Sequence, residues 1–273
     1  DVICDRNYRQ GISVINAENL LIEDTVMQYT AGTAPQAGID FEPNRPGERL
    51  VNCVMRNCTT RGNRSNGFVL YLRPMDATSR PISVRLENCT SIEDGAGGFG
   101  FITGNRGDAA VTGTMVFDRC VVRRSASAGF LIGDNPTHGC AITVRDCVIE
   151  NAAAGSPLQA PIMFMSRSGA ADPVGNATFS SVLVRDRLDR APMQYIDGGG
   201  GVPLGGISGE LIVQQKGGRE TIALTHDVLA NWMPQIALKQ IPLVDIAGME
   251  FRPVADIPPT DTGTIRIARF RNA

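Results

Sequence analysis

The chain has 273 residues, of which 42% are hydrophobic, 5% aromatic and 20% charged. Its 26 basic and 28 acidic side chains leave a formal net charge of -2, which excludes the strongly basic surface of a nucleic-acid-binding protein. No apolar run approaches the roughly 18 residues that a membrane-spanning helix needs, so we expect no membrane span. The 30 glycines and few aromatic residues favour many short strands and tight turns over a helical bundle.

A four-residue apolar motif, introduced by glycine or proline, recurs along the first part of the chain. Successive copies begin 27, 29, 31, 31, 32 and 31 residues apart, and a period of this length is typical of a solenoid protein. The second and fourth residues of every copy are apolar, which places them inside if each copy is a strand. The seven copies are Gly11-Ile12-Ser13-Val14, Gly38-Ile39-Asp40-Phe41, Gly67-Phe68-Val69-Leu70, Gly98-Phe99-Gly100-Phe101, Gly129-Phe130-Leu131-Ile132, Pro161-Ile162-Met163-Phe164 and Pro192-Met193-Gln194-Tyr195.

A second motif ends in cysteine and runs in phase with the first. It follows strand-like runs such as residues 82–86 and 141–144. With one cysteine per coil, the spacing lacks the close pairs of zinc motifs, so it favours a buried column of small apolar side chains and no metal site. The total of seven cysteines is odd, so at least one thiol in the chain has no cysteine partner. The four motif cysteines are Cys58, Cys89, Cys120 and Cys147.

Repeats of this length are too short for a strand–helix–strand unit. Coils of short strands stacked about 4.8 Å apart form a right-handed parallel β-helix. The glycine quartets and the Asn-Cys bends resemble the right-handed parallel β-helix (pectin lyase-like) superfamily, which holds pectin and alginate lyases, polygalacturonases, carrageenases and phage tailspikes. The resemblance covers roughly residues 1–200 and implies an all-β solenoid of about seven coils in a carbohydrate-active protein.

The period fades beyond residue 200. We interpret residues 201–273 as a C-terminal cap that packs on the solenoid, because the open end of a solenoid has to be covered. Strands are expected at 210–213, 221–224 and 264–267, and one short helix at 227–233, ended by Pro234.

The chain starts without an initiator methionine and enters the repeat almost at once. We therefore expect a processed or trimmed piece of a secreted bacterial protein, located outside the cell or in the periplasm.

The second quartet carries unusual chemistry. Alternation along the strand sends Asp40 and Glu42 outward, where the corresponding residues of the other coils are mostly apolar. Their Cα atoms would lie about 6.6 Å apart, which suits two acids acting on one bond. A carboxyl group beside apolar neighbours and a second acid is also expected to have a raised pKa.

Polar residues gather around this pair. Adjacent coils are expected to bring Ser13 beside Asp40 and Tyr71 beside Glu42, and a hydroxyl-, amide- and guanidinium-rich surface suits a sugar chain, especially an acidic one. The predicted substrate-binding residues are Arg9, Ser13, Gln36, Asn44, Tyr71 and Arg73, with Arg73 near Asn44.

The sequence predicts a glycoside hydrolase that needs no metal or cofactor. Glu42 would be the proton donor and Asp40 the base or nucleophile, although the two roles can be exchanged. The spacing matches the two acids of carrageenase-like hydrolases, whereas the motifs of polygalacturonases are absent. One alternative is a lyase or epimerase of uronic acids, with Tyr71 transferring the proton and Arg73 neutralising the carboxylate. The other is a non-catalytic glycan-binding or adhesive module, with its apolar face as a homotrimer contact.

Overall fold

The structure, a computed structural model, describes residues 1–223 apart from residues 108, 157–158, 189, 200 and 216–217, with side chains described up to residue 214. The helix expected at 227–233 and the strand expected at 264–267 lie outside these residues. None of the described residues is helical. Consequently, no helix in the described part of the chain could cross a membrane.

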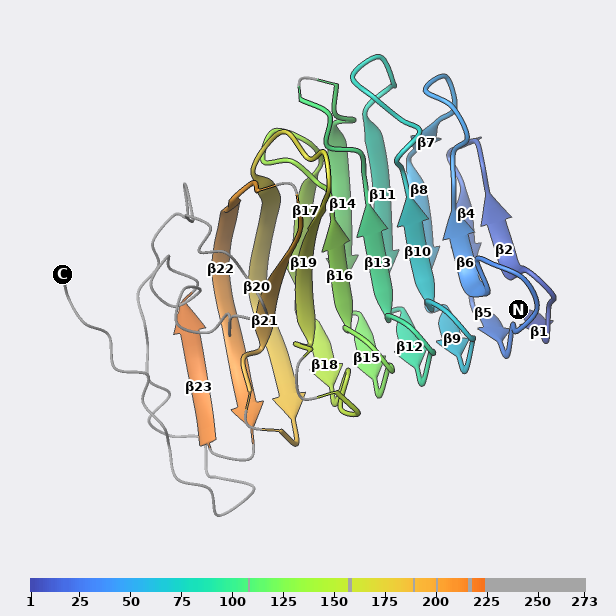
Figure 1. Cartoon of the computed structure of the whole chain (residues 1–273). Coiled ribbons are helices and arrows are strands. Elements are labelled where there is room, and N and C mark those ends of the chain that lie inside the picture. The colour runs from blue at the N-terminus through green and yellow to red at the C-terminus, as the bar shows by residue number, and fades with distance from the viewer. Residues whose placement is uncertain (108, 157–158, 189, 200, 216–217, 224–273) are drawn as a thin grey trace.

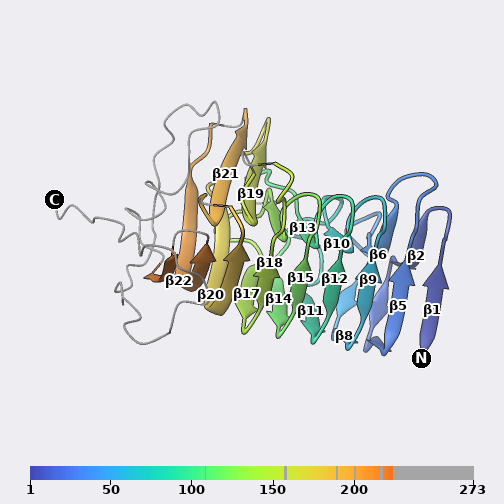
Figure 2. The ribbon, with the colours of Figure 1, turned by 90° about the horizontal axis from the view of Figure 1, so that it is seen from below.

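The described chain forms a parallel β-solenoid, as expected, in which strands of successive coils lie side by side along one axis (Figures 1 and 2). One face is a seven-stranded sheet with one strand per coil. Its strands are β2 (Gln10–Val14), β6 (Ala37–Phe41), β10 (Phe68–Tyr71), β13 (Phe99–Ile102), β16 (Phe130–Gly133), β19 (Ile162–Arg167) and β21 (Met193–Gly198).

A 14-stranded sheet forms the remaining faces as two rows that the long strand β20 (Val174–Asp186) connects. The first row contains β1 (Val2–Asp5), β5 (Thr25–Gln28), β9 (Thr59–Arg61), β12 (Thr90–Ile92), β15 (Val121–Arg123) and β18 (Val148–Glu150). The second contains β4 (Leu21–Glu23), β8 (Cys53–Arg56), β11 (Ile82–Glu87), β14 (Gly113–Asp118) and β17 (Ala141–Arg145). A separate pair consists of β3 (Ala17–Glu18) and β7 (Leu50–Val51).

The apolar positions of the quartets fill the interior, because alternate residues of a strand face the same side. Phe68, Phe99 and Phe130 stack along the axis with ring centroids 4.8 and 5.1 Å apart. Phe117, from the opposite sheet, packs edge-on against Phe99 and Phe130. One ladder of aromatic rings therefore links both sheets across three coils.

The cysteine motif marks a bend with a buried residue after it. Cys58, Cys89, Cys120 and Cys147 are fully buried, which confirms the predicted core column. The residue before each cysteine has a left-handed backbone, with φ of 53° at Asn57 and 52° at Asn88. Asparagine tolerates this conformation better than most residues. The Asn57 amide also donates to Asp24 Oδ1 at 3.1 Å, and the Asn88 amide to Asn57 Oδ1 at 3.4 Å.

Parallel pairing continues beyond residue 200. Strand β22 (Leu204–Gln215) contains the run expected at 210–213 and pairs in parallel with β20. Strand β23 (Gly218–Ala223) overlaps the run expected at 221–224 and pairs antiparallel with β22. The antiparallel pairing of β23 thus departs from the parallel ladder of the coils.

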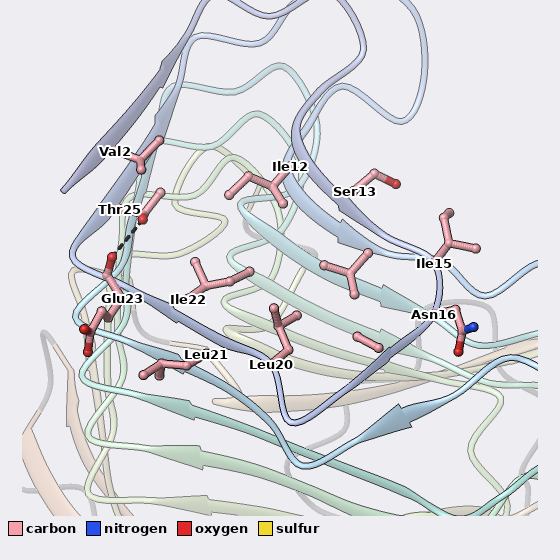
Figure 3. Close-up of a pocket in the computed structure, with 12 residues that line it drawn as sticks. Val2, Ile12, Ser13, Ile15, Asn16, Leu20, Leu21, Ile22, Glu23 and Thr25 are labelled. Carbon is pink, nitrogen blue, oxygen red and sulfur yellow. Dashed lines mark hydrogen bonds between the residues drawn. The ribbon is translucent and has the colours of Figure 1, made fainter.

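At the other end, the interior of the first coil opens into a hollow of about 830 Å³. Figure 3 shows Ile12, Leu20 and Ile22 around it, all apolar side chains of the first coil. Val2 and Leu21 at its rim are 53% and 52% exposed. This hollow is the end of the core, and neither Asp40 nor Glu42 lines it.

Candidate functional site

Strand β6 lies between β2 and β10, with Asp40 level with Ser13 on one side and Val69 on the other. Its Ile39 and Phe41 are core residues, so alternation turns Asp40 to the outer face of the seven-stranded sheet. Glu42 follows the end of the strand by one residue and continues the same alternation. The predicted neighbourhood of Ser13 and Asp40 is therefore present.

Asp40 is the most unusual carboxyl group on this face. It is only 1% exposed, and neither of its oxygens accepts a hydrogen bond from a donor group among the described residues. The pKa of Asp40 is raised to about 8, first by burial and then by the hydrogen bond and the charge of the adjacent Glu42 carboxyl group, while the charge of Arg9 opposes the shift. A carboxyl group in this position holds its proton at neutral pH.

Glu42 differs from Asp40 in its access to solvent. Its side chain is 29% exposed, and Arg9 Nη2 lies 3.8 Å from Glu42 Oε2. The sequence-based hypothesis made Glu42 the proton donor with the raised pKa. In the structure, the carboxyl group with the raised pKa is Asp40, because Asp40 is the buried member of the pair.

The loop between β5 and β6 is tied to Arg9, in the bend that leads into β2. Arg9 Nε donates to the carbonyl oxygen of Ala34 at 3.1 Å, and the backbone N–H of Gln36 donates to the carbonyl oxygen of Arg9 at 2.8 Å. The Gln36 side-chain amide donates to the carbonyl oxygen of Gly32 within the same loop. Gln36 therefore shapes the loop, while Arg9 reaches Glu42 as well.

Arg73 was expected near Asn44, and this placement stays a prediction, although the Arg73 guanidinium has another partner. The Arg73 guanidinium points away from β6 along the solenoid, and its Nη2 lies 4.0 Å from Asp134 Oδ2. Asn44 belongs to a different local structure, in which its backbone N–H donates to the Glu48 carboxylate. Tyr71 ends β10, level with Glu42 if the register of β6 and β10 continues by one residue.

The outer face beyond β6 is apolar, as the sequence indicates. Val69, Ile102 and Met163 face outward but are only 5%, 7% and 8% exposed. Sequence reasoning missed Asp134 and Arg167 on this side of the sheet. A signal was available for Arg167, since it follows Met165 by two residues as Arg73 follows Tyr71.

The described residues offer no group of three or more histidine, cysteine, aspartate or glutamate side chains arranged to hold a metal ion. His138 is an exposed residue of the loop between β16 and β17. All seven cysteines are free, and burial raises the pKa of Cys140 to about 12. A buried, protonated thiol such as that of Cys140 is a poor metal ligand.

The described chain is thus an all-β parallel solenoid with an acid pair on the outer face of one sheet. The family model for the right-handed β-helix region matches residues 2–177. The chain belongs to this right-handed β-helix family. Neither the curated proteins nor the solved structures compared with the chain contain a match.

Proposed function

We propose that the protein is a polysaccharide-degrading glycoside hydrolase in which Asp40 and Glu42 are the acid and the base or nucleophile. Right-handed β-helices occur in polysaccharide-degrading enzymes and also in non-catalytic proteins, so the fold alone does not decide the function. The observation that carries the proposal is Asp40, a buried carboxyl group that accepts no hydrogen bond from the donors in the described part of the chain and lies next to a second acid on an outer sheet face.

Hydrolysis of a glycosidic bond needs one protonated and one ionised carboxyl group. The raised pKa of about 8 keeps Asp40 protonated at neutral pH, which supports its role as proton donor. Glu42 is 29% exposed, which supports the role of base or nucleophile for this acid. This exchanges the roles that the sequence-based hypothesis assigned first.

In this proposal, Asp40 reaches the sugar only after neighbouring side chains move, because it is 1% exposed. The Arg9–Glu42 contact is long, at 3.8 Å, and lies on the surface. Contacts of this kind contribute about 0–1 kcal/mol, so a bound substrate can replace it at little cost.

The test is release of reducing ends from a panel of neutral and anionic polysaccharides. We expect Asp40→Asn and Glu42→Gln each to lower kcat by about 10²- to 10⁴-fold, the usual contribution of a general acid or base. Wild-type activity should also fall as the pH rises through about 8, because Asp40 then loses its proton. In Asp40→Asn, any residual activity should no longer fall as the pH rises through about 8.

Glu150→Gln is the matched control. The Glu150 side chain is 27% exposed and pairs with Arg123 at 3.4 Å on the other sheet, much as Glu42 pairs with Arg9. The Glu150→Gln variant should be as active as the wild type. Cleavage that survives both substitutions in the acid pair would remove the pair from the mechanism. An unsaturated, ultraviolet-absorbing product would instead indicate a lyase, and binding without cleavage a glycan-binding module.

A further inference from the structure

Two arginines from distant coils converge on one buried carboxylate. Arg73 follows β10 and Arg167 ends β19, while Asp134 comes directly after β16, between them. Arg73 Nη2 lies 4.0 Å and Arg167 Nε 3.7 Å from Asp134 Oδ2. The backbone N–H of Arg167 donates to the other oxygen, Asp134 Oδ1, at 2.8 Å.

The cluster of Arg73, Asp134 and Arg167 still has groups that can form further hydrogen bonds. Asp134 is 2% exposed, and its Oδ2 has no hydrogen-bond partner among the described residues. Both guanidinium distances exceed the length of a hydrogen bond, so the arginines balance the charge without donating to it. The side chains of Arg73 and Arg167 remain 30% and 40% exposed. Two guanidiniums therefore face one shared carboxylate oxygen.

The two arginines belong to the same outward column of the seven-stranded sheet. Each lies two residues beyond a partner in the ladder of Tyr71, Ile102, Gly133 and Met165. Arg167 lies within β19, so alternation turns it away from the core to the outer face. Arg73 lies in the turn after β10, and its contact with the same Asp134 oxygen brings its guanidinium to the side of Arg167.

Between the two arginines, this column holds no outward side chain. Gly104 occupies one position, where an added Cβ would meet only the carbonyl oxygen of Arg73, at 3.4 Å. Asn135 occupies the next, but its amide is turned inward and donates to the carbonyl oxygens of Cys140 and Gly175 at 2.9 and 2.8 Å. The strip between the guanidiniums is therefore free of competing polar groups from this column.

The acid on the next strand is already bound. Asp197 of β21 accepts a hydrogen bond from Ser166 Oγ at 2.7 Å and others from the backbone N–H groups of Gly199 and Gly201 at 3.2 Å. Asp134 is thus the acid that both guanidiniums share, and it keeps them close together.

We propose that Arg73 and Arg167 form a binding subsite for the anionic groups of an acidic polysaccharide. This proposal rests on the proposed function, because it takes the ligand to be a glycan. It adds that the glycan is negatively charged and that it runs along the outer face from β6 towards β19. The planar fork of a guanidinium binds a carboxylate or a sulfate group through two parallel hydrogen bonds. Asp134 is the positioning residue.

The experiment measures glycan binding by titration calorimetry at low and physiological salt. The probes are polygalacturonate for uronate groups, dextran sulfate for sulfate groups and dextran as the neutral chain. Arg73→Gln and Arg167→Gln are each expected to weaken binding of an acidic probe about tenfold, the loss typical of one charge-assisted contact. All proteins are compared in the wild-type and Asp40→Asn backgrounds, so that cleavage of the probe does not obscure binding.

Arg123→Gln is the matched control, since Arg123 is 49% exposed and pairs with Glu150 at 3.4 Å on the other sheet. It should change binding less than about twofold. Three results would overturn the subsite. They are an equal loss of affinity in Arg123→Gln, unchanged affinity in both Arg73→Gln and Arg167→Gln, and no binding of either acidic probe. Cleavage of a neutral glycan without acidic binding would leave the hydrolase proposal standing alone. Arginine-dependent binding without cleavage would leave only the subsite.

Discussion

Two buried aspartates show how the surroundings of a carboxyl group decide its chemistry. Asp94 is fully buried, yet it accepts hydrogen bonds from the hydroxyls of Thr60 and Ser91 at 2.7 Å and from the backbone and side-chain N–H groups of Asn63 at 2.9 Å. Asp40 is 1% exposed but accepts none from the residues that the structure describes. Asp94 therefore serves the fold, whereas the cost of burying Asp40 has no such compensation.

This contrast predicts that Asp40→Asn stabilises the protein at alkaline pH. The folded-state pKa of about 8 exceeds the ordinary value of 3.8, so the folded state holds a proton that the unfolded state has released between these values. Stability falls as the pH rises through this window, and asparagine removes the loss. We expect a gain of roughly 2–4 kcal/mol at pH 9 and little at pH 4, measured by guanidinium chloride unfolding.

Asp94→Asn is the comparison for this measurement. An asparagine amide would turn two donors towards groups that already donate, so a loss of about 1–3 kcal/mol is expected at pH 4. Burial also raises the pKa of Asp94, so the loss should be smaller at pH 9. A loss of stability in Asp40→Asn at pH 9 would show that the Asp40 carboxylate is stabilised by contacts that the structure lacks.

At the level of one element, each bend before a buried cysteine needs a left-handed residue. Asn88, with φ of 52°, also accepts a hydrogen bond from Arg119 Nε at 2.9 Å, which extends the asparagine ladder by one coil. Backbone conformation and ladder hydrogen bonds therefore contribute separately at one position.

Two substitutions separate these contributions. Asn88→Gly loses the ladder contacts but keeps the conformation, whereas Asn88→Ala loses both. We expect alanine to be less stable than glycine by about 1–2 kcal/mol, the cost of a left-handed conformation for a residue with a Cβ. Chemical denaturation of both variants measures the difference. Equal stabilities would mean that the bend relaxes out of this conformation.

At the scale of the whole molecule, each coil contacts mainly its neighbours, so stability is not uniform along the axis. The first coil has a partner on one side only among the described residues, and Val2 and Leu21 are exposed. The central coils are held on both sides by the stack of Phe68, Phe99 and Phe130.

Hydrogen exchange should follow this gradient. We expect amides of β1 and β4 to exchange at least about tenfold faster than those of β10 and β13, because opening an end coil breaks one interface and opening a central coil breaks two. Mass spectrometry of peptides from both regions measures the rates. Uniform protection from β1 to β13 would mean that the solenoid opens as a single unit.

Much of the fold follows from local patterns in the chain. The quartets specify which side chains enter the core, and the Asn-Cys bends specify where the backbone turns, because alternation and left-handed conformations are properties of short segments. Parallel stacking then follows from seven repeats of nearly equal length. The pairing of Ser13 with Asp40 was predictable for the same reason.

The chemistry of the candidate site depended on the tertiary structure. Which acid of the pair is buried is set by side chains and loops from several coils, so the raised pKa of Asp40 could not be read from the spacing of two acids. The direction of the Arg73 side chain could not be read either, since a long side chain reaches past its immediate neighbours. Its partner Asp134 lies two coils away, in a bend outside the apolar repeat.

The sequence alone determined the solenoid and the strand that carries the acids, because both depend on local alternation and repeat length. Only the tertiary structure decided their burial and charge partners, because these depend on contacts between coils.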